Sequence, residues 1–300
     1  MPHTITLICN PANTVLDTSL ISDLSDALER EGGQIGRLEW LDGPIAADLE
    51  CAGLQPDMIE DILRDKLGDD PVDVVVHLAG EDRRRKLLVA DMDSTIITVE
   101  CLDELADFAG KKAEVSAITE RAMRGELVFE DALRERIAIL AGLPESALAG
   151  TYADRVRLMP GARELVRTMA ANGAHAVLVS GGFSYFTERV AADAGFHAER
   201  ANRLIFENSL LKGVAEPILG REAKLAALHE FCTVHGISES QAMAIGDGAN
   251  DLAMIQVAGM GVAFHAKPVV AAAARARIDH GDLTALLYLQ GYRGGDFVRD

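Results

Sequence analysis

The sequence predicts an α/β protein: a doubly wound, Rossmann-like parallel sheet with an inserted helical subdomain, preceded by an N-terminal ferredoxin-like α+β domain. Over residues 1–80, short apolar runs alternate with amphipathic segments in the order βαββαβ, which is typical of the split βαβ arrangement. From residue 87 onward, continuous apolar runs typical of strands buried on both faces alternate with helical patterns. Residues 100–158 carry amphipathic helical patterns and no strand pattern, so we expect the helical insertion there.

In the N-terminal domain we expect strands at ITLIC, QIGRLEWL, IAADLEC and VDVVVHL, and helices at SLISDLSDALERE and DMIEDILRDKL. The charged segment EDRRRK at residues 81–86 then interrupts the apolar pattern, as domain boundaries often do. We therefore expect one domain over residues 1–80 and a second over residues 81–300. The basic run at residues 83–86 is expected to be a solvated linker.

The second domain begins with the apolar run LLVAD, and similar runs recur at HAVLVS, AMAIGD and GMGVAF. Between and after them lie the helical patterns YFTERVAADAG, EAKLAALHEFCTVHG, NDLAMIQVAG and PVVAAAARAR, and RLIFENSLLKGVAE has the pattern of a hairpin. Strands alternating with helices indicate a doubly wound sheet. Such sheets bind ligands beyond the carboxyl ends of their strands, so we expect the functional site there.

Composition excludes several classes of partner. The 300 residues include 29 Lys plus Arg and 47 Asp plus Glu, for a net charge of −18, which disfavours nucleic acids and anionic membrane surfaces. No apolar run approaches the ~18 residues of a membrane-spanning helix, and the first residues lack the pattern of a signal peptide, so we expect a cytoplasmic protein. The four cysteines form no CxxC pair, which indicates neither a disulfide framework nor a zinc site.

Two aspartates follow the run LLVA directly. In an extended chain, Asp91 and Asp93 would point to the same side and face the crevice at the end of the strand. Taken alone, such residues after a strand more often form a turn that caps the next helix. Neighbouring carboxylates repel each other unless a cation or a shared proton compensates, so this pair points to function only if further groups converge on it.

A second acidic cluster follows another apolar run, in the segment GDGAND at residues 246–251. It adds Asp247 and Asp251, and its glycines let the backbone bend closely around a small ion or a phosphate. If the two strands are neighbours, up to four carboxylates meet. An all-oxygen set of this kind suits Mg²⁺, which takes few protein carboxylates and keeps several waters or phosphate oxygens.

Phosphate-binding groups are expected in two further places. Ser180 and Gly181 end the run HAVLVS and precede a helix, and helix starts and clusters of backbone N–H groups bind phosphate oxygens. Lys224 lies early in the helical pattern EAKLAALHE. A single surface lysine is usually only solvated, but beside the other groups it becomes a candidate to neutralise a phosphate or a carboxylate.

The order DxDST, SGG, a helical lysine and GDGAND resembles the four motifs of the haloacid dehalogenase superfamily of phosphatases. The resemblance is closest to the phosphoserine phosphatase family, covers residues 87–287, and includes VECLDELA, ITERAMRGELVFEDALRERIAIL, LVSGGFSYFTERV, ANRL and GDGANDLAMI. It implies Mg²⁺-dependent hydrolysis of O-phosphoserine to serine and inorganic phosphate, the last step of serine biosynthesis.

The resemblance also implies a role for each motif residue. Asp91 would be the nucleophile that forms a phosphoaspartyl intermediate, and Asp93 would act as general acid and then general base. Mg²⁺ would be held by the Asp91 side chain, the Asp93 backbone carbonyl and Asp247, with Asp251 orienting these ligands.

The same resemblance assigns phosphate contacts to Ser180, Gly181, Lys224 and Asn250. The helical insertion, at about residues 100–158, resembles the cap of the family. In the cap region, Glu100 would bind the substrate ammonium and Arg136 its carboxylate, while Met123 and Phe129 would cover the substrate. Without the family, these four would be ordinary surface charges and core residues.

The N-terminal domain resembles the ACT-like modules of some longer phosphoserine phosphatases. Amino-acid sensing and a purely architectural or dimer-forming role are about equally supported, so a homodimer is one expectation. We also expect residues 81–300 to keep measurable activity without this domain.

Two alternatives stay open. The first is a phosphatase or phosphotransferase acting on another small phosphorylated amino acid or alcohol. The second, from another class, is a non-catalytic, amino-acid-sensing protein that binds phosphate in an acidic pocket. An acid–base residue at Asp93 and a cap inserted after the nucleophile both favour an enzyme.

Overall fold

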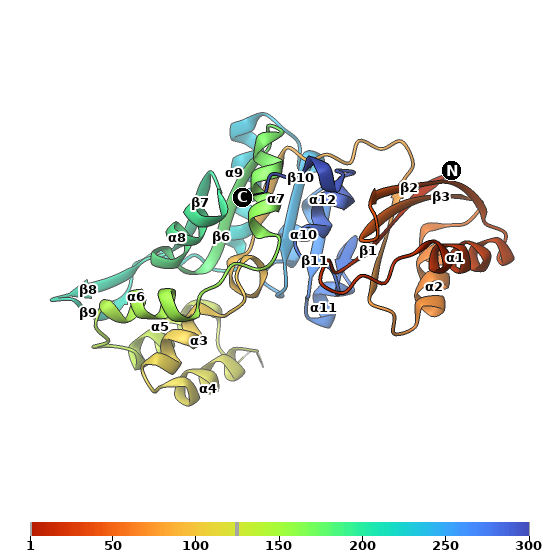
Figure 1. Ribbon diagram of the computed structural model, residues 1–300. Helices are drawn as coiled ribbons and strands as arrows, with labels where there is room; N and C mark the ends of the chain where they lie inside the picture. The colour runs from red at the N-terminus through yellow and green to blue at the C-terminus, as the bar shows by residue number, and fades with distance from the viewer. Residues whose placement is uncertain (1, 124–125, 300) are drawn as a thin grey trace.

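The computed structural model describes residues 2–123 and 126–299. The N-terminal sheet and the larger parallel sheet lie side by side, and the helical insertion lies at the far end of the molecule from the N-terminal sheet (Figure 1). None of the helices within the described residues is both long and apolar enough to cross a membrane. All four cysteines are buried and free.

The N-terminal unit has the predicted βαββαβ order. Its elements are β1 (His3–Cys9), α1 (Thr18–Arg30), β2 (Gln34–Asp42), β3 (Ala46–Ala52), α2 (Pro56–Leu67) and β4 (Val72–Leu78). They form an antiparallel sheet in the order β2-β3-β1-β4. Alternate side chains of β1, such as Ile5 and Leu7, pack with Leu24 of α1 and Leu63 of α2, so both helices cover one face. The ferredoxin-like part of the prediction is confirmed.

The second sheet is parallel and has the order β12-β11-β10-β5-β6-β7. Its strands are β5 (Leu87–Ala90), β6 (His175–Phe183), β7 (Ala198–Asn202), β10 (Ala242–Gly246), β11 (Met260–Phe264) and β12 (Ala276–Ile278). The predicted doubly wound sheet is confirmed, and the four predicted strands lie at its centre. The edge strands β7 and β12 were not predicted from the sequence.

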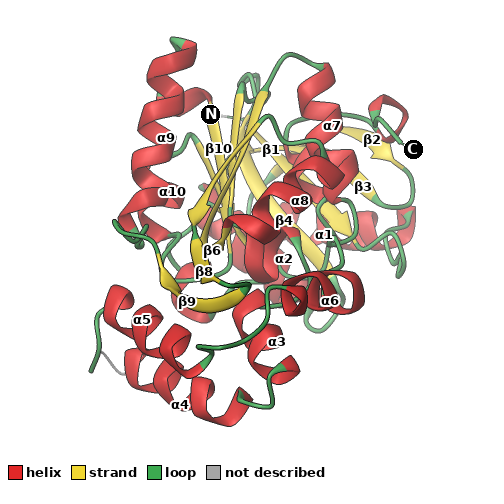
Figure 2. Cartoon of the chain, turned by 90° about the vertical axis from the view of Figure 1, so that its left-hand side faces the viewer, coloured by secondary structure: helices red, strands yellow, loops and turns green. Residues whose placement is uncertain are grey.

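Helices cover both faces of this sheet (Figure 2). On one face lie α7 (Ala162–Ala171), α8 (Ser184–Ala194) and α12 (Ala285–Leu289), and on the other α9 (Glu222–His235), α10 (Leu252–Val257) and α11 (Pro268–Ala271). The buried β5 contributes Leu88 to the first core and Val89 to the second, as strand alternation requires. Of the helix expected in PVVAAAARAR only α11 forms, because the chain enters β12 at Ala276.

The insertion consists of α3 (Cys101–Phe108), α4 (Lys112–Met123), α5 (Phe129–Ile139) and α6 (Ser146–Arg155). The predicted hairpin is present as β8 (Leu204–Glu207) and β9 (Leu210–Val214). It bonds to the insertion through its backbone, since Gly142 N–H donates to the Leu211 carbonyl at 2.8 Å and Leu211 N–H donates to the Leu143 carbonyl at 2.9 Å. The hairpin therefore links the parallel sheet to the insertion.

The expectation that the basic run at residues 83–86 is solvated holds for Arg84 and Lys86, which are exposed, and is wrong for Arg83 and Arg85. Arg83 donates to Asp48 Oδ2 at 2.5 Å, with both side chains at least 85% buried, and Arg85 is only 7% exposed. Arg84 lies over the ring of Tyr292, 3.9 Å from its centroid. A buried carboxylate needs a paired cation. Asp48, which is distant in sequence, therefore holds Arg83 in the junction between the two sheets.

The second face of the N-terminal sheet is also covered. Ile8 and Val75 belong to the same apolar core as Leu286 and Tyr288 of α12. At the edge of this contact, the buried Asp73 accepts backbone N–H groups of residues 279–281, at 2.7 Å from Asp279 and 2.7 Å from Gly281. The N-terminal sheet is thus attached by apolar packing and by a hydrogen-bonded carboxylate.

Candidate active site

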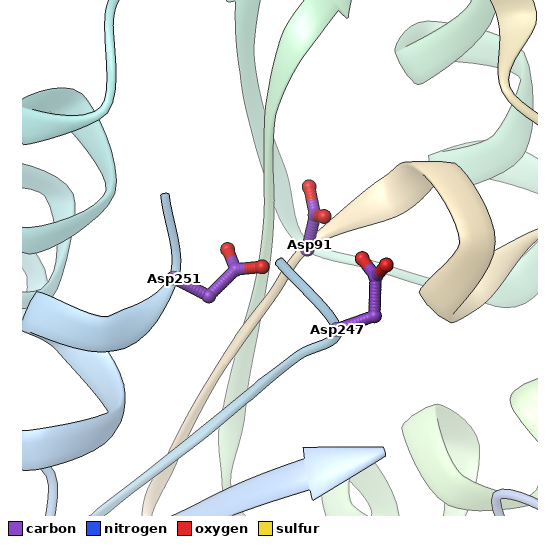
Figure 3. A group of neighbouring side chains, drawn as sticks. All are labelled: Asp91, Asp247 and Asp251. Atoms are coloured by element: carbon purple, nitrogen blue, oxygen red, sulfur yellow. The ribbon is translucent and has the colours of Figure 1, made fainter. Parts of the chain in front are cut away.

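The motif residues meet at one edge of the parallel sheet because their strands are neighbours. Asp91 follows β5, Asp247 follows β10, and Ser180 lies near the end of β6. Asp251 precedes α10, and its side chain points back toward Asp91 and Asp247 (Figure 3). The site therefore lies beyond the carboxyl ends of the strands, as a doubly wound sheet requires.

Three carboxylates converge at this edge. Asp91, Asp247 and Asp251 each offer an oxygen, and these oxygens all lie within 4.8 Å of one another. Asp251 is fully buried and Asp91 is 5% exposed. The close approach depends on Gly246, because a Cβ at that position would lie 2.2 Å from Asp251 Cγ.

Lys224 lies between two of these carboxylates. Its Nζ lies 2.6 Å from Asp91 Oδ1 and 2.6 Å from Asp251 Oδ1, and the residue is 2% exposed. Burial alone would lower the pKa of Lys224, but the two carboxylates outweigh burial and raise it. Burial also raises the pKa of Asp91, with a further contribution from the charge of Asp251.

Asp93 stands apart from the three-carboxylate cluster. Its Oδ1 accepts the backbone N–H of Cys101 at 2.8 Å, and its Oδ2 accepts the hydroxyl of Ser180 at 3.0 Å. Burial raises the pKa of Asp93, and the bond from Cys101 N–H opposes that rise. The backbone keeps extended dihedrals at Asp91 (φ −69°, ψ 158°) and at Asp93 (φ −68°, ψ 133°), and the chain turns away at Ser94, which has φ 57°. The bond from Ser180 holds the Asp93 carboxylate against β6.

The segment expected to bind phosphate forms a bulge at the end of β6. The pairing of β6 with β7 shifts between Val179 and Phe183, which turns Ser180 and Gly181 out of the ladder. Gly182 N–H donates to Ser180 Oγ at 2.8 Å. Asn250 is half-buried in the loop after β10. Its side chain packs closely against Gly248, since a Cβ added at Gly248 would lie 2.4 Å from Asn250 Oδ1.

The insertion places its expected substrate residues over this edge. Glu100 Oε1 accepts the hydroxyl of Ser94 at 2.9 Å. Partial enclosure, followed by the charges of Asp93 and Asp247, raises the pKa of Glu100 to about 7. Burial lowers the pKa of Arg136, and the charges of Asp103 and Glu100 oppose that change.

The remaining two expected residues both lie on the insertion. The ring of Phe129 covers the bulge closely, since a Cβ at Gly181 would lie 3.0 Å from Phe129 Cζ. Met123 ends α4, and its side chain lies outside the described part of the structure.

Two residues that the structure brings to the site were not predicted from the sequence. Lys267 N–H donates to the Asp247 carbonyl at 3.0 Å, and Lys267 Nζ lies 3.9 Å from Asp247 Oδ2. Lys267 follows β11, the neighbour of β10, so the rule that found Asp247 could have found it too. The other is Asn202, a buried amide at the end of β7.

The donor set suits a divalent cation with oxygen ligands. Three buried or nearly buried carboxylates face one another with one buried lysine among them, which leaves uncompensated negative charge. Such a cluster costs free energy unless a cation binds, and carboxylate oxygens are typical ligands of Mg²⁺. Asp91, a member of this cluster that is paired with Lys224, is also suited to act as a nucleophile.

Comparisons with known proteins match this region of the chain. The haloacid dehalogenase-like hydrolase family matches residues 88–256. A phosphoserine phosphatase of Albidiferax ferrireducens is 47% identical over 210 residues, which are 68% of this chain and 89% of that protein.

Two solved structures extend the comparison. A haloacid dehalogenase family hydrolase of Salmonella enterica serovar Typhi superposes with a TM-score of 0.82 at 27% identity, covering 96% of this chain and 98% of that one. A phosphoserine phosphatase captured as an analogue of its phospho-aspartyl intermediate superposes with a TM-score of 0.63 at 35% identity, covering 68% of this chain and 98% of that one.

Proposed function

The chain is an enzyme of the haloacid dehalogenase-like hydrolases and belongs to their phosphoserine phosphatase family, and on that premise we propose that it hydrolyses O-phosphoserine to serine and inorganic phosphate. The observation that carries this proposal is the buried Asp91, which pairs with Lys224 beside two further carboxylates. Glu100, whose pKa responds to the charges of Asp93 and Asp247, and Arg136, whose pKa responds to the charge of Glu100, belong to the insertion next to it. The sheet edge provides groups for phosphoryl transfer, and the insertion provides groups for an amino acid.

In the first step, an Asp91 oxygen attacks phosphorus and the bond from phosphorus to the serine oxygen breaks. Asp93 supplies the proton that the departing serine oxygen needs. Its raised pKa supports this role. The product of the step is a phosphoaspartyl group on Asp91 and free serine.

In the second step, water attacks the phosphoaspartyl group and Asp93 takes its proton back. The bond between phosphorus and the Asp91 oxygen breaks, which releases inorganic phosphate and restores the carboxylate. Ser180 and Asn250, with the backbone of Gly181, hold the phosphoryl oxygens, and Lys224 balances their charge. Because Lys224 pairs with Asp91 and Asp251 in this structure, its ammonium needs only a small movement to reach a phosphoryl oxygen.

The metal site is proposed for Mg²⁺. The Asp91 side chain, the Asp93 backbone carbonyl and Asp247 would hold it, and Asp251 would orient that set. When bound, the ion supplies positive charge that stabilises the phosphoryl oxygens in the transition state.

The substrate amino acid is proposed to lie between Glu100 and Arg136. A carboxylate at Glu100 attracts an ammonium group, and a guanidinium at Arg136 can bind a carboxylate through two parallel hydrogen bonds. Phe129 and Met123 would cover the phosphoserine and exclude water. This arrangement favours a phosphorylated amino acid over a simple phosphorylated alcohol.

The wider assignments follow from the same proposal. Residues 81–300 would form the phosphatase domain, with a cap at about residues 100–158, and residues 1–80 an ACT-like regulatory or dimerisation domain. The enzyme would act in the cytoplasm, in the last step of serine biosynthesis.

The test is phosphate release from O-phospho-L-serine with Mg²⁺ or with EDTA, beside phosphothreonine and para-nitrophenyl phosphate. We expect metal-dependent turnover with preference for phosphoserine, and its loss in Asp91→Asn, because an amide is a poor nucleophile of nearly the same shape. Near wild-type turnover in Asp91→Asn would refute the covalent mechanism. Turnover of the aryl phosphate alone would refute the substrate.

A further inference from the structure

Asn202 occupies a special position at the end of β7. It is 2% exposed and pairs with Phe183 just after the shift in the β6–β7 ladder. The bulge leaves the Gly181 carbonyl without a partner from the regular ladder, and a buried carbonyl without a partner is costly. The Asn202 side chain lies against this irregular part of β6.

The amide of Asn202 binds two separate segments. Its Nδ2 donates to the Gly181 carbonyl at 2.9 Å and to the Leu219 carbonyl at 3.2 Å, and its Oδ1 accepts the Leu219 N–H at 2.7 Å. The Leu219 N–H can only donate, so it fixes which end of the amide is oxygen. Both donors and the acceptor of this buried side chain are therefore used.

The bond to Gly181 continues as a chain of hydrogen bonds into the site. The peptide whose carbonyl accepts from Asn202 also carries the Gly182 N–H, which donates to Ser180 Oγ at 2.8 Å. Ser180 Oγ in turn donates to Asp93 Oδ2 at 3.0 Å. Each bond in such a chain polarises and orients the next, so the orientation of this peptide also orients the Asp93 carboxylate.

The bonds to Leu219 hold the segment that leads into α9. Lys224 lies in the first turn of α9, the helix that positions its ammonium group, and Leu219 lies five residues before it, ahead of the helix. The ring of Phe129 lies over both of these segments. A Cβ added at Gly181 would lie 3.0 Å from Phe129 Cζ, and a Cβ added at Gly220 would lie 3.8 Å from Phe129 Cδ1. Asn202 thus binds the bulge and the approach to Lys224 where Phe129 covers them both.

We infer that Asn202 is a positioning residue for the phosphoryl group: by tying Gly181 to Leu219, it sets the distance between the phosphate-binding bulge and Lys224. It makes no contact with the reacting atoms itself. The inference deepens the proposed function and rests on its assignment of Gly181 and Lys224 to the phosphate.

The test compares Asn202 with a matched buried amide elsewhere. Gln290 is also 2% exposed, accepts the Arg85 N–H at 3.1 Å and donates to the Leu286 carbonyl at 3.0 Å. It lies beside Met243, near the start of β10 and so at the end of the sheet opposite Asp247. The paired variants are Asn202→Asp with Gln290→Glu, which replace a donor by a carboxylate, and Asn202→Leu with Gln290→Leu, which remove the hydrogen bonds.

For each variant we would measure the dissociation constant of inorganic phosphate by calorimetry, kcat and KM for O-phosphoserine, and the midpoint of thermal unfolding. All variants should lose thermal stability, because each leaves buried polar groups without partners. Only the Asn202 variants should lose phosphate affinity, by about tenfold, and kcat, by between about tenfold and a hundredfold. The Gln290 variants should stay within about twofold of wild type on both.

Equal losses of phosphate affinity in the Asn202 and Gln290 variants, or wild-type affinity and kcat in both Asn202 variants, would overturn the inference. If Asn202→Leu does not fold, Asn202→Ser carries the same comparison, since it brings neither a charge nor extra bulk. A wild type that binds phosphate but does not turn over phosphoserine would refute the proposed substrate, while phosphate affinity in the variants would still decide the role of Asn202.

Discussion

Replacing Asp247 with asparagine should separate metal binding from the stability of the fold. The variant keeps the shape of the side chain and removes one charge from a cluster whose oxygens lie within 4.8 Å of one another. At an effective dielectric constant of about 20, repulsion between two unit charges at that distance is about 3 kcal/mol. The attraction between Asp247 and Lys267, at 3.9 Å, is about 4 kcal/mol before solvent around the 54% exposed lysine weakens it.

Asp247 faces two such carboxylates, Asp91 and Asp251, so repulsion outweighs the screened attraction to Lys267. Without metal, the free energy of unfolding of Asp247→Asn should therefore be at least that of wild type. With Mg²⁺ at about a hundred times its dissociation constant, wild type should gain about 2.7 kcal/mol. The variant should gain little or nothing, because it has lost a proposed ligand. The assay is urea unfolding followed by circular dichroism, with Mg²⁺ and with EDTA.

The control is Asp61→Asn, which removes an exposed charge from α2 and should keep the full gain from Mg²⁺. An equal gain in Asp247→Asn and wild type would show that Asp247 is not a ligand. No gain in wild type would refute the Mg²⁺ proposal itself. Either result would contradict the electrostatic argument without any appeal to enzyme activity.

Three further predictions concern substrate choice and the domain junction. Arg136→Ala should lower kcat/KM for phosphoserine at least about tenfold more than for para-nitrophenyl phosphate; equal losses would show that Arg136 does not bind the substrate carboxylate. Asp73→Ala should lower the free energy of unfolding by about 3 kcal/mol, because the part-buried N–H groups of Asp279 and His280 and the buried N–H of Gly281 lose their acceptor; urea unfolding checks this, and a loss below about 1 kcal/mol would contradict it. Burial, followed by the charges of Arg83 and Arg85, lowers the pKa of His77 from 6.5 to about 3. As the pH falls, the unfolded chain therefore binds a proton at this residue before the folded protein does. The free energy of unfolding of wild type should fall by up to about 2 kcal/mol between about pH 7 and about pH 5 for this reason. Urea unfolding of His77→Gln should lack that part of the loss, and identical pH dependence in the two proteins would contradict the assignment.

The sequence could predict the edge where the carboxylates meet because its rule is local. Asp91 and Asp247 each come directly after an apolar run, and parallel strands bring such positions to one edge whatever the length of chain between them. The direction of Asp93 could not be predicted in this way. It depends on hydrogen bonds from the Cys101 N–H and from Ser180 Oγ, which come from the insertion and from β6.

Asn202 illustrates the limit of pattern reasoning on single residues. Its place in ANRL is part of the family resemblance, but an asparagine after a strand is ordinary turn chemistry. Its importance appears only when the bulge in β6 leaves Gly181 without a ladder partner and the amide lies opposite it. That pairing depends on a register shift between two strands, which hydrophobic periodicity does not encode.

The junction between the sheets was not predicted for a similar reason, and it changes what removal of the N-terminal domain would test. Ile8 packs into the same core as Tyr288, so residues 81–300 alone would expose apolar surface that the full chain buries. The junction also reaches toward the site: Gly281 N–H binds Asp73 and the Gly281 carbonyl contacts His265 Nε2 at 2.9 Å, two residues before Lys267. Loss of activity on truncation would therefore follow from loss of docking as well as from loss of regulation. Asp73→Ala in the full chain, which weakens the attachment without removing the domain, separates the two causes.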